Sequence, residues 1–245
     1  MRVYNLAMIE RACIVLAAGK GSRLGLRDKP KVMAGLYEKP FLHYTVETVL
    51  KTNPDIFIIV TGYKGEVIKR YFGKDLKYQD QTVLDGNARA LKEGLKGVDK
   101  PTKNILVLQG DDSAFYMPDT IQKLELQHER SEADITMLFT NDYETKVFNS
   151  QYARSDDMRI TRMLNRVNST DGNYFIGTFC AKKEILSSIV SRDKPANTTD
   201  IILTALNEGK KVYGMTVPNG EWRGINTPQE LEKANIMMSD RYSLK

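Results

Sequence analysis

The sequence predicts an α/β fold in which helices cover both faces of a mostly parallel sheet. Short apolar runs are spread along the chain, segments with helical periodicity lie between them, and most of the runs are continuously apolar. Strands covered on both faces have this continuous pattern, and alternating strands and helices favour parallel strands joined by right-handed crossovers. The predicted strands cover residues 13–17, 56–60, 105–108, 135–139, 174–180 and 212–217.

Amphipathic segments fill the intervals between these strands. The first, residues 41–51, has one apolar face, as expected of a helix that packs on a sheet. The last, residues 228–239, begins with a capping box, because Thr227 precedes Pro228 and Glu230 follows three residues after Thr227. The other predicted helices cover residues 66–72, 87–96, 119–130, 184–191 and 200–208.

Residues 141–173 interrupt this alternation. The segment is polar and rich in arginine and aspartate, and it predicts a small hairpin excursion that covers a site. Neither a repeat nor a linker divides the sequence, so we expect residues 1–245 to form a single domain.

The composition excludes several classes of protein. The 245 residues are 41% hydrophobic and 27% charged, which is ordinary for a globular chain. The net charge of +5 is too small to indicate a nucleic-acid partner, and the apolar runs are shorter than the ~20 residues of a membrane span. Cys13 and Cys180 each lie in an apolar run and predict buried thiols. The N-terminus does not read as a signal peptide, so we expect a cytoplasmic protein.

A glycine loop follows the first predicted strand. The string L-A-A-G-K-G-S-R-L-G at residues 16–25 lets the backbone approach a ligand closely, and its amides can face anionic oxygens. It is neither a dinucleotide fingerprint nor a Walker A loop. Five cationic residues in and after the loop would suit a triphosphate: Lys20, Arg23, Arg27, Lys29 and Lys31. The same pattern is also typical of a strand-to-helix turn with a solvated basic face.

Three further strings carry side chains suited to a nucleotide site. Residues 81–90 read Q-T-V-L-D-G-N-A-R-A, and a glutamine amide offers a donor and an acceptor to the uracil edge. Residues 106–112 read L-V-L-Q-G-D-D and place acids at the end of a predicted strand, where open α/β sheets bind ligands. Residues 222–228 read W-R-G-I-N-T-P, with Asn226 directly before the last helix.

In order and spacing, these strings resemble the sugar-phosphate nucleotidyltransferase family. The glycine loop, Pro30-Lys31 and the string K-P-F-L-H-Y at residues 39–44 are nearest to the uridylyltransferase domain of the N-acetylglucosamine-1-phosphate enzymes. Thymidylyl- and uridylyltransferases of glucose 1-phosphate are more distant. The resemblance covers residues 13–228 and implies a Rossmann-like fold, with a nucleotide-binding half at about residues 11–113 and an acceptor-binding half at about 114–228.

The resemblance also implies roles for individual residues. Arg23 and Lys31 would be catalytic, and Asp111 and Asn226 would hold Mg²⁺, which prefers a few oxygen ligands plus substrate phosphates. The nucleotide would be bound by Leu16, Ala17, Ala18, Gly19, Gly21, Gln81, Gly86, Asn87 and Gly110. The acceptor would contact Asp112, Gly177 and Thr199. Asp200 is expected to be structural, at the start of a helix.

The family's activity would be the transfer of a nucleotidyl group from UTP or dTTP to a sugar 1-phosphate, with release of pyrophosphate. Two alternatives stay open: a cytidylyltransferase of the same fold that acts on a non-sugar phosphate, and a non-catalytic subunit that senses nucleotides. The acceptor-binding half departs from the family, because its usual glutamate is missing and Phe175-Ile176-Gly177 stands where the nearest branch has Asn-Thr-Gly. We therefore leave the identity of the acceptor and the oligomeric state open.

Overall fold

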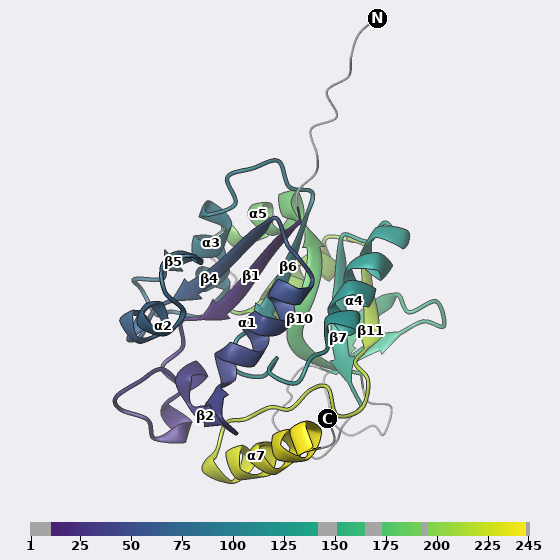
Figure 1. The fold of residues 1–245 in the computed structure, drawn as a ribbon. Coiled ribbons are helices and arrows are strands. Elements are labelled where there is room, and N and C mark those ends of the chain that lie inside the picture. The colour runs from purple at the N-terminus through teal and green to yellow at the C-terminus, as the bar shows by residue number, and fades with distance from the viewer. Residues whose placement is uncertain (1–10, 142–150, 165–172, 193–195, 244–245) are drawn as a thin grey trace, which may run out of the picture.

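A computed structural model describes residues 11–141, 151–164, 173–192 and 196–243. Among these residues the main sheet has nine strands, and seven of them follow the order β11-β7-β10-β6-β1-β4-β5 (Figure 1). The six predicted strands form as β1 (Ala12–Ala17), β4 (Ile56–Thr61), β6 (Asn104–Gln109), β7 (Ile135–Thr140), β10 (Tyr174–Lys182) and β11 (Val212–Thr216). The mostly parallel α/β sheet is thus confirmed, with β10 running antiparallel between β6 and β7.

Sequence reasoning missed the strand at one edge of the sheet. β5 (Lys77–Asp80) pairs with β4 in parallel, although it carries two charged residues and has no apolar run. The backbone of β4 offers β5 a row of hydrogen-bonding partners, and an edge strand does not need apolar side chains to accept them. A second small sheet, also not predicted, joins β2 (Gly35–Leu36) to β3 (Lys39–Pro40).

The seven predicted helices also form, within a residue or two of the expected bounds except at the C-terminal end of the last. They are α1 (Phe41–Lys51), α2 (Gly65–Phe72), α3 (Asn87–Lys96), α4 (Pro118–Arg130), α5 (Lys183–Val190), α6 (Thr198–Asn207) and α7 (Pro228–Ser243). Two short 3-10 turns, at Ser22–Leu24 and Lys31–Met33, lie in the loop after β1.

The core has two layers, one on each face of the sheet. Alternate residues of β1 point to opposite faces: Ile14 and Leu16 pack with α3, α5 and α6, while Cys13 and Val15 pack with α1, α2 and α4. This alternation follows from the two-residue period of a strand. Both cysteines are buried, as predicted, and burial raises the pKa of each thiol well above its usual value.

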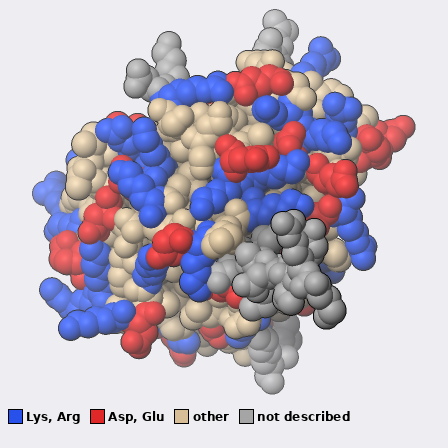
Figure 2. Space-filling model, turned by 90° about the horizontal axis from the view of Figure 1, so that it is seen from above, with Lys and Arg blue, Asp and Glu red and all other residues tan. Residues whose placement is uncertain are grey.

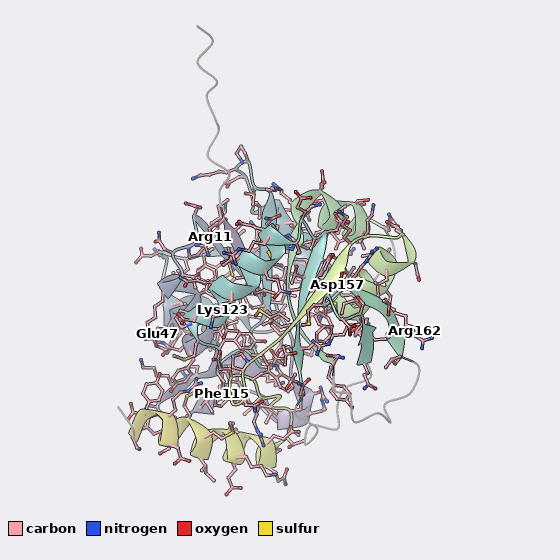
Figure 3. All side chains as sticks on the ribbon, turned by 90° about the vertical axis from the view of Figure 1, so that its right-hand side faces the viewer. Arg11, Glu47, Phe115, Lys123, Asp157 and Arg162 are labelled. Atoms are coloured by element: carbon pink, nitrogen blue, oxygen red, sulfur yellow. The ribbon has the colours of Figure 1, made fainter. Side chains whose placement is uncertain are left out.

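The last helix, α7, lies beneath the carboxyl ends of the parallel strands and covers a third, smaller apolar cluster (Figure 1). Figure 3 shows Phe115 directly above α7. Arg241 of α7 donates a hydrogen bond of 2.8 Å to the carbonyl oxygen of Phe115, and its guanidinium lies 5.8 Å from the centre of that ring. Helix α7 thereby fixes the segment that follows Asp111.

The described part of the predicted excursion is a hairpin. β8 (Gln151–Arg154) pairs antiparallel with β9 (Ile160–Leu164), and residues 142–150 and 165–172 lie outside the described residues. The amide of Gly214 donates to the Met158 carbonyl at 3.0 Å, so the turn of the hairpin lies along the edge strand β11. Arg162 projects outward from this hairpin in Figure 3.

Charges of both signs are interspersed on the face seen in Figure 2. Lys182, at the end of β10, pairs with Asp134, which precedes β7, at 2.7 Å. No helix among the described residues is long and apolar enough to cross a membrane. The division into a nucleotide-binding half and an acceptor-binding half stays a prediction.

Candidate active site

A cavity of about 450 Å³ opens at the carboxyl ends of the central parallel strands. Segments far apart in the sequence meet there because parallel strands end at the same edge of a sheet. Twelve of the predicted site residues line it: Leu16, Ala17, Ala18, Gly19, Gly21, Arg23, Lys31, Gln81, Gly86, Asn87, Asp111 and Asn226. Five further residues line it: Lys20, one of the five cations that suit a triphosphate, and Val32, Leu84, Ala90 and Gln109, which the sequence did not single out.

The loop after β1 wraps one wall of this cavity. Gly21 has a φ of +64°, and a Cβ built on it would lie 2.1 Å from the Cβ of Lys31. Only glycine fits there, because a side chain would be strained by the left-handed backbone and would overlap the stem of the lysine. The amide of Tyr63, just after β4, donates to the Ala18 carbonyl at 3.1 Å and holds the start of the loop. The glycine spacing in the sequence therefore has a steric cause.

The ammonium of Lys31 joins the two predicted metal ligands. Its Nζ lies 2.6 Å from Oδ2 of Asp111 and 3.0 Å from Oδ1 of Asn226, and the lysine side chain is only 7% exposed. Two oxygens from distant parts of the chain therefore converge on one cation. Hard oxygen ligands of this kind suit Mg²⁺, which keeps several waters and takes phosphate oxygens as further ligands. Among the described residues no group of three or more His, Cys, Asp or Glu forms a metal cage.

Asn226 is held by the capping box that the sequence predicted. One oxygen of the Glu230 carboxylate accepts hydrogen bonds from the amides of Asn226, at 2.6 Å, and Thr227, at 2.9 Å. The amide of Glu230 in turn donates to the Thr227 hydroxyl at 3.2 Å. The start of α7 therefore fixes the backbone that carries the Asn226 side chain.

The Gln81 amide has one possible orientation. Its Nε2 donates to the carbonyl oxygens of Val83, at 2.8 Å, and Gly86, at 2.9 Å. Both partners are acceptors only, so the nitrogen and not the oxygen must face them. The side-chain oxygen Oε1 is then the polar atom of Gln81 that remains for a ligand in the cavity.

Four predicted site residues do not line the cavity: Gly110, Asp112, Gly177 and Thr199. Asp112 is half-buried outside its wall, and desolvation of its carboxyl together with the charge of Asp111 raises the pKa of that carboxyl well above its usual value. Its Oδ1 has no hydrogen-bond partner within the part of the chain that the structure describes. Gly110 fixes the strand end instead, since its amide donates to the Leu16 carbonyl at 2.9 Å. An acceptor-binding role for Asp112 stays a prediction.

Gly177 lies beside the cavity and not in its wall. It has a φ of +81°, and its carbonyl accepts a hydrogen bond of 3.4 Å from Nε2 of Gln109, which does line the cavity. A Cβ at Gly177 would lie 2.6 Å from the Cγ of Gln109. Gln109 could have been found in the sequence as the single polar residue that ends a buried strand.

Helix α6 begins at Thr198, two residues before the predicted start, and Asp200 has the predicted structural role. The Asp200 carboxylate accepts from the amide of Asn197 at 3.1 Å, and the Asn197 side chain accepts from the amide of Asp200 at 2.9 Å. Both halves of a capping box are therefore present. Thr199, in the first turn of this helix, is half-buried.

The fold and the cavity are those of an α/β nucleotidyltransferase. A glycine loop, the cations Arg23 and Lys31, and the oxygen-bearing side chains of Asp111 and Asn226 meet at one edge of the sheet. Residues 13–174 match the family model described as the MobA-like NTP transferase domain, and the chain belongs to that family. The resemblance to sugar-phosphate nucleotidyltransferases inferred from the sequence is thereby confirmed.

Curated relatives of different names align with most of the chain. The chain is 27% identical over 248 residues to the bifunctional protein GlmU of Sulfurimonas denitrificans, covering 93% of this chain and 53% of that protein. It is 27% identical over 228 residues to the D-glycero-alpha-D-manno-heptose 1-phosphate guanylyltransferase of Aneurinibacillus thermoaerophilus, covering 90% and 95%. The chain thus spans about half the length of the GlmU relatives.

A solved structure shares the fold. The inositol-1-phosphate CTP transferase from T. maritima superposes with a TM-score of 0.75 at 22% identity, covering 96% of this chain and 97% of that one. At this level of identity the likeness establishes the architecture and not the substrate.

Proposed function

We propose that this chain transfers the nucleotidyl group of UTP or dTTP to a sugar 1-phosphate in a magnesium-dependent reaction. An oxygen of the acceptor phosphate attacks the α-phosphorus in line, the bond to the β-phosphate oxygen breaks, and pyrophosphate leaves. The observation that carries the proposal is the convergence of Lys31, Asp111 and Asn226 beside a glycine loop in one cavity. Positioning and electrostatic stabilisation are the main requirements of such a transfer.

Each group in the cavity has a part in this scheme. Asp111 and Asn226 would hold Mg²⁺, which would neutralise phosphate oxygens when it is bound. Arg23 and Lys31 would stabilise the charge that develops on the triphosphate as pyrophosphate leaves. The loop from Ala18 to Gly21 would bring its backbone close to the phosphates, because Ala18, Gly19 and Gly21 carry a methyl group or no side chain.

The orientation of Gln81 supports a base with an N–H on its pairing edge. With Nε2 engaged by two carbonyls, the polar atom left to face a ligand is Oε1, which accepts hydrogen bonds and donates none. Uracil and thymine present a ring N–H to such an acceptor, whereas the corresponding ring nitrogen of cytosine is itself an acceptor. Guanine also has a ring N–H, so a guanine nucleotide belongs in the test.

A thermal-shift panel tests the choice of nucleotide. UTP, dTTP, CTP, GTP and ATP are compared with Mg²⁺ present, on the wild-type protein and on Gln81→Ala. A ligand at 100 times its Kd adds about 2.7 kcal/mol, which raises Tm by several degrees at this chain length. We expect shifts for UTP and dTTP that Gln81→Ala weakens. A shift confined to CTP or GTP would contradict the proposed nucleotide.

Pyrophosphate release tests the reaction itself. With a panel of sugar 1-phosphates, wild type should release pyrophosphate, and Arg23→Ala should be slower by about 100-fold or more, as when other charge-stabilising donors are lost. Release equal to wild type in Arg23→Ala would remove that residue from the mechanism. Binding without release for every acceptor would instead favour the nucleotide-sensing subunit.

A further inference from the structure

The side chain of Asn87 is engaged by a helix from the other half of the chain. Its Oδ1 accepts a hydrogen bond of 2.8 Å from the amide of Thr198, which lies 111 residues away, and its Nδ2 lies 3.5 Å from the Thr198 hydroxyl. Asn87 is the first residue of α3 and Thr198 the first of α6. Although Asn87 lines the cavity, both polar atoms of its side chain therefore face α6.

The backbone beside Asn87 packs against the same turn. A Cβ placed on Gly86, whose φ is +123°, would lie 2.0 Å from the carbonyl oxygen of Ala196. The amide of Ala88 donates to that oxygen at 3.3 Å. The start of α3 therefore rests directly on the turn before α6, and glycine is needed at position 86 for this close approach.

The turn itself is held firmly. The Asp200 carboxylate accepts hydrogen bonds from the amides of Ala196, at 3.0 Å, and Asn197, at 3.1 Å. These bonds satisfy backbone amides that a helix start would otherwise leave unpaired. Asn87 thus binds to a helix start that is itself held by hydrogen bonds.

One more hydrogen bond connects the contact between Asn87 and α6 to Gln81. The Gly86 carbonyl is one of the two acceptors that orient the Gln81 amide, at 2.9 Å. The Asn87–Thr198 bond fixes Gly86, and Gly86 helps to direct Oε1 of Gln81 toward a ligand. We infer that Asn87 is a positioning residue that joins the base-reading segment, residues 81–86, to α6 and so sets the base selectivity of the cavity. This inference rests on the proposed function.

Two substitutions remove the bond from opposite sides. Asn87→Ala deletes the acceptor. Thr198→Pro deletes the amide hydrogen at the first position of a helix, where proline is well tolerated, and Asn197 before it already has extended backbone with φ −140° and ψ 172°. Thr198→Ala is the matched control, because it removes the hydroxyl and keeps the 2.8 Å backbone bond. Asn87→Asp keeps an acceptor and should restore the function that Asn87→Ala loses.

The measurement is a ratio of dissociation constants, for the nucleotide that wild type binds most tightly and the one it binds least tightly. A change in protein stability or in the active fraction of protein does not alter this ratio. The added charge of Asn87→Asp acts on a triphosphate that both nucleotides share, so its effect also cancels in the ratio. We expect the ratio to fall at least fivefold in Asn87→Ala and in Thr198→Pro, and the double variant to fall no further. Thr198→Ala and Asn87→Asp should stay within twofold of wild type.

The outcomes separate the inference from the proposed function. A ratio within twofold of wild type in both Asn87→Ala and Thr198→Pro would overturn the positioning role, as would additive effects in the double variant, since independent sites add. If one single variant does not fold, the other decides. If wild-type protein binds no nucleotide triphosphate, the proposed function has failed, whatever the variants do.

Discussion

The ammonium of Lys31 lies 2.6 Å from the carboxylate of Asp111, and so the cation of the glycine loop neutralises a predicted metal ligand. The same ammonium contacts the side-chain oxygen of Asn226. A divalent ion on these two oxygens would lie close to a positive charge, and like charges a few Å apart repel by several kcal/mol even at an effective dielectric constant of about 20. Lys31 and the metal therefore compete unless anionic phosphates draw the lysine away.

This competition predicts that Lys31→Met strengthens metal binding in the absence of nucleotide. We expect at least about a tenfold lower Kd for Mn²⁺, equivalent to about 1.4 kcal/mol, measured by electron paramagnetic resonance of free Mn²⁺. Lys20→Met is the matched control: Lys20 also lines the cavity, but no contact of Lys20 with Asp111 or Asn226 occurs in the described structure. Equal or weaker Mn²⁺ binding in Lys31→Met would disprove the competition.

The contact between Gly21 and Lys31 predicts a loss of function from one added methyl group. Gly21→Ala would place Cβ within 2.1 Å of the Lys31 stem and should displace the lysine, lowering turnover by about 100-fold or more. Gly25→Ala is the control, because Gly25 has a similar φ of +70° but nothing within 4 Å of its Cβ. Steady-state rates of pyrophosphate release distinguish the two. Equal losses would mean that backbone strain, and not the displaced lysine, is responsible.

The capping box of α7 predicts that Glu230 affects the metal site through the backbone of Asn226, without binding the metal itself. Glu230→Ala frees the amide of Asn226 and should weaken Mn²⁺ binding several-fold. Loss of a cap also costs about 1 kcal/mol of stability, which a thermal melt detects. Glu232→Ala, an acidic position on the same helix outside the capping box, serves as the control. Unchanged metal affinity in Glu230→Ala would show that Asn226 does not need this support.

Burial of His128 predicts a loss of stability in mild acid. Burial lowers the pKa of this imidazole to about 4, and its two nitrogens pair with Thr136 and Asn104. The unfolded chain takes up a proton near pH 6.5 and the folded one only near pH 4, so this contribution to stability is complete above pH 6.5 and is lost as the pH falls toward 4. The slope of Tm against pH in this window should be smaller in His128→Gln. An identical slope would contradict the assignment.

Local sequence patterns were sufficient to predict most of the strands, the helices and much of the candidate site. The apolar runs identified the buried strands, since β1 and β4 need apolar side chains on both faces. The glycine loop, Asp111 and Asn226 were found because each adjoins a strand end or a helix start, and parallel strands bring such positions to one edge of the sheet. The acceptor-binding role of Asp112 came from the family resemblance and stays a prediction, since its half-buried side chain does not line the cavity.

The sequence by itself determined the fold class, the positions of the main strands and helices and most of the cavity lining, because these depend on periodicity and on short strings. Tertiary structure alone decided the polar edge strand β5, which forms only against β4, and the pairing of Asn87 with Thr198 across 111 residues. It also decided which atom of Gln81 faces the cavity. Hydrogen bonds between distant segments depend on the geometry of packed elements, and no local pattern of residue types encodes that geometry.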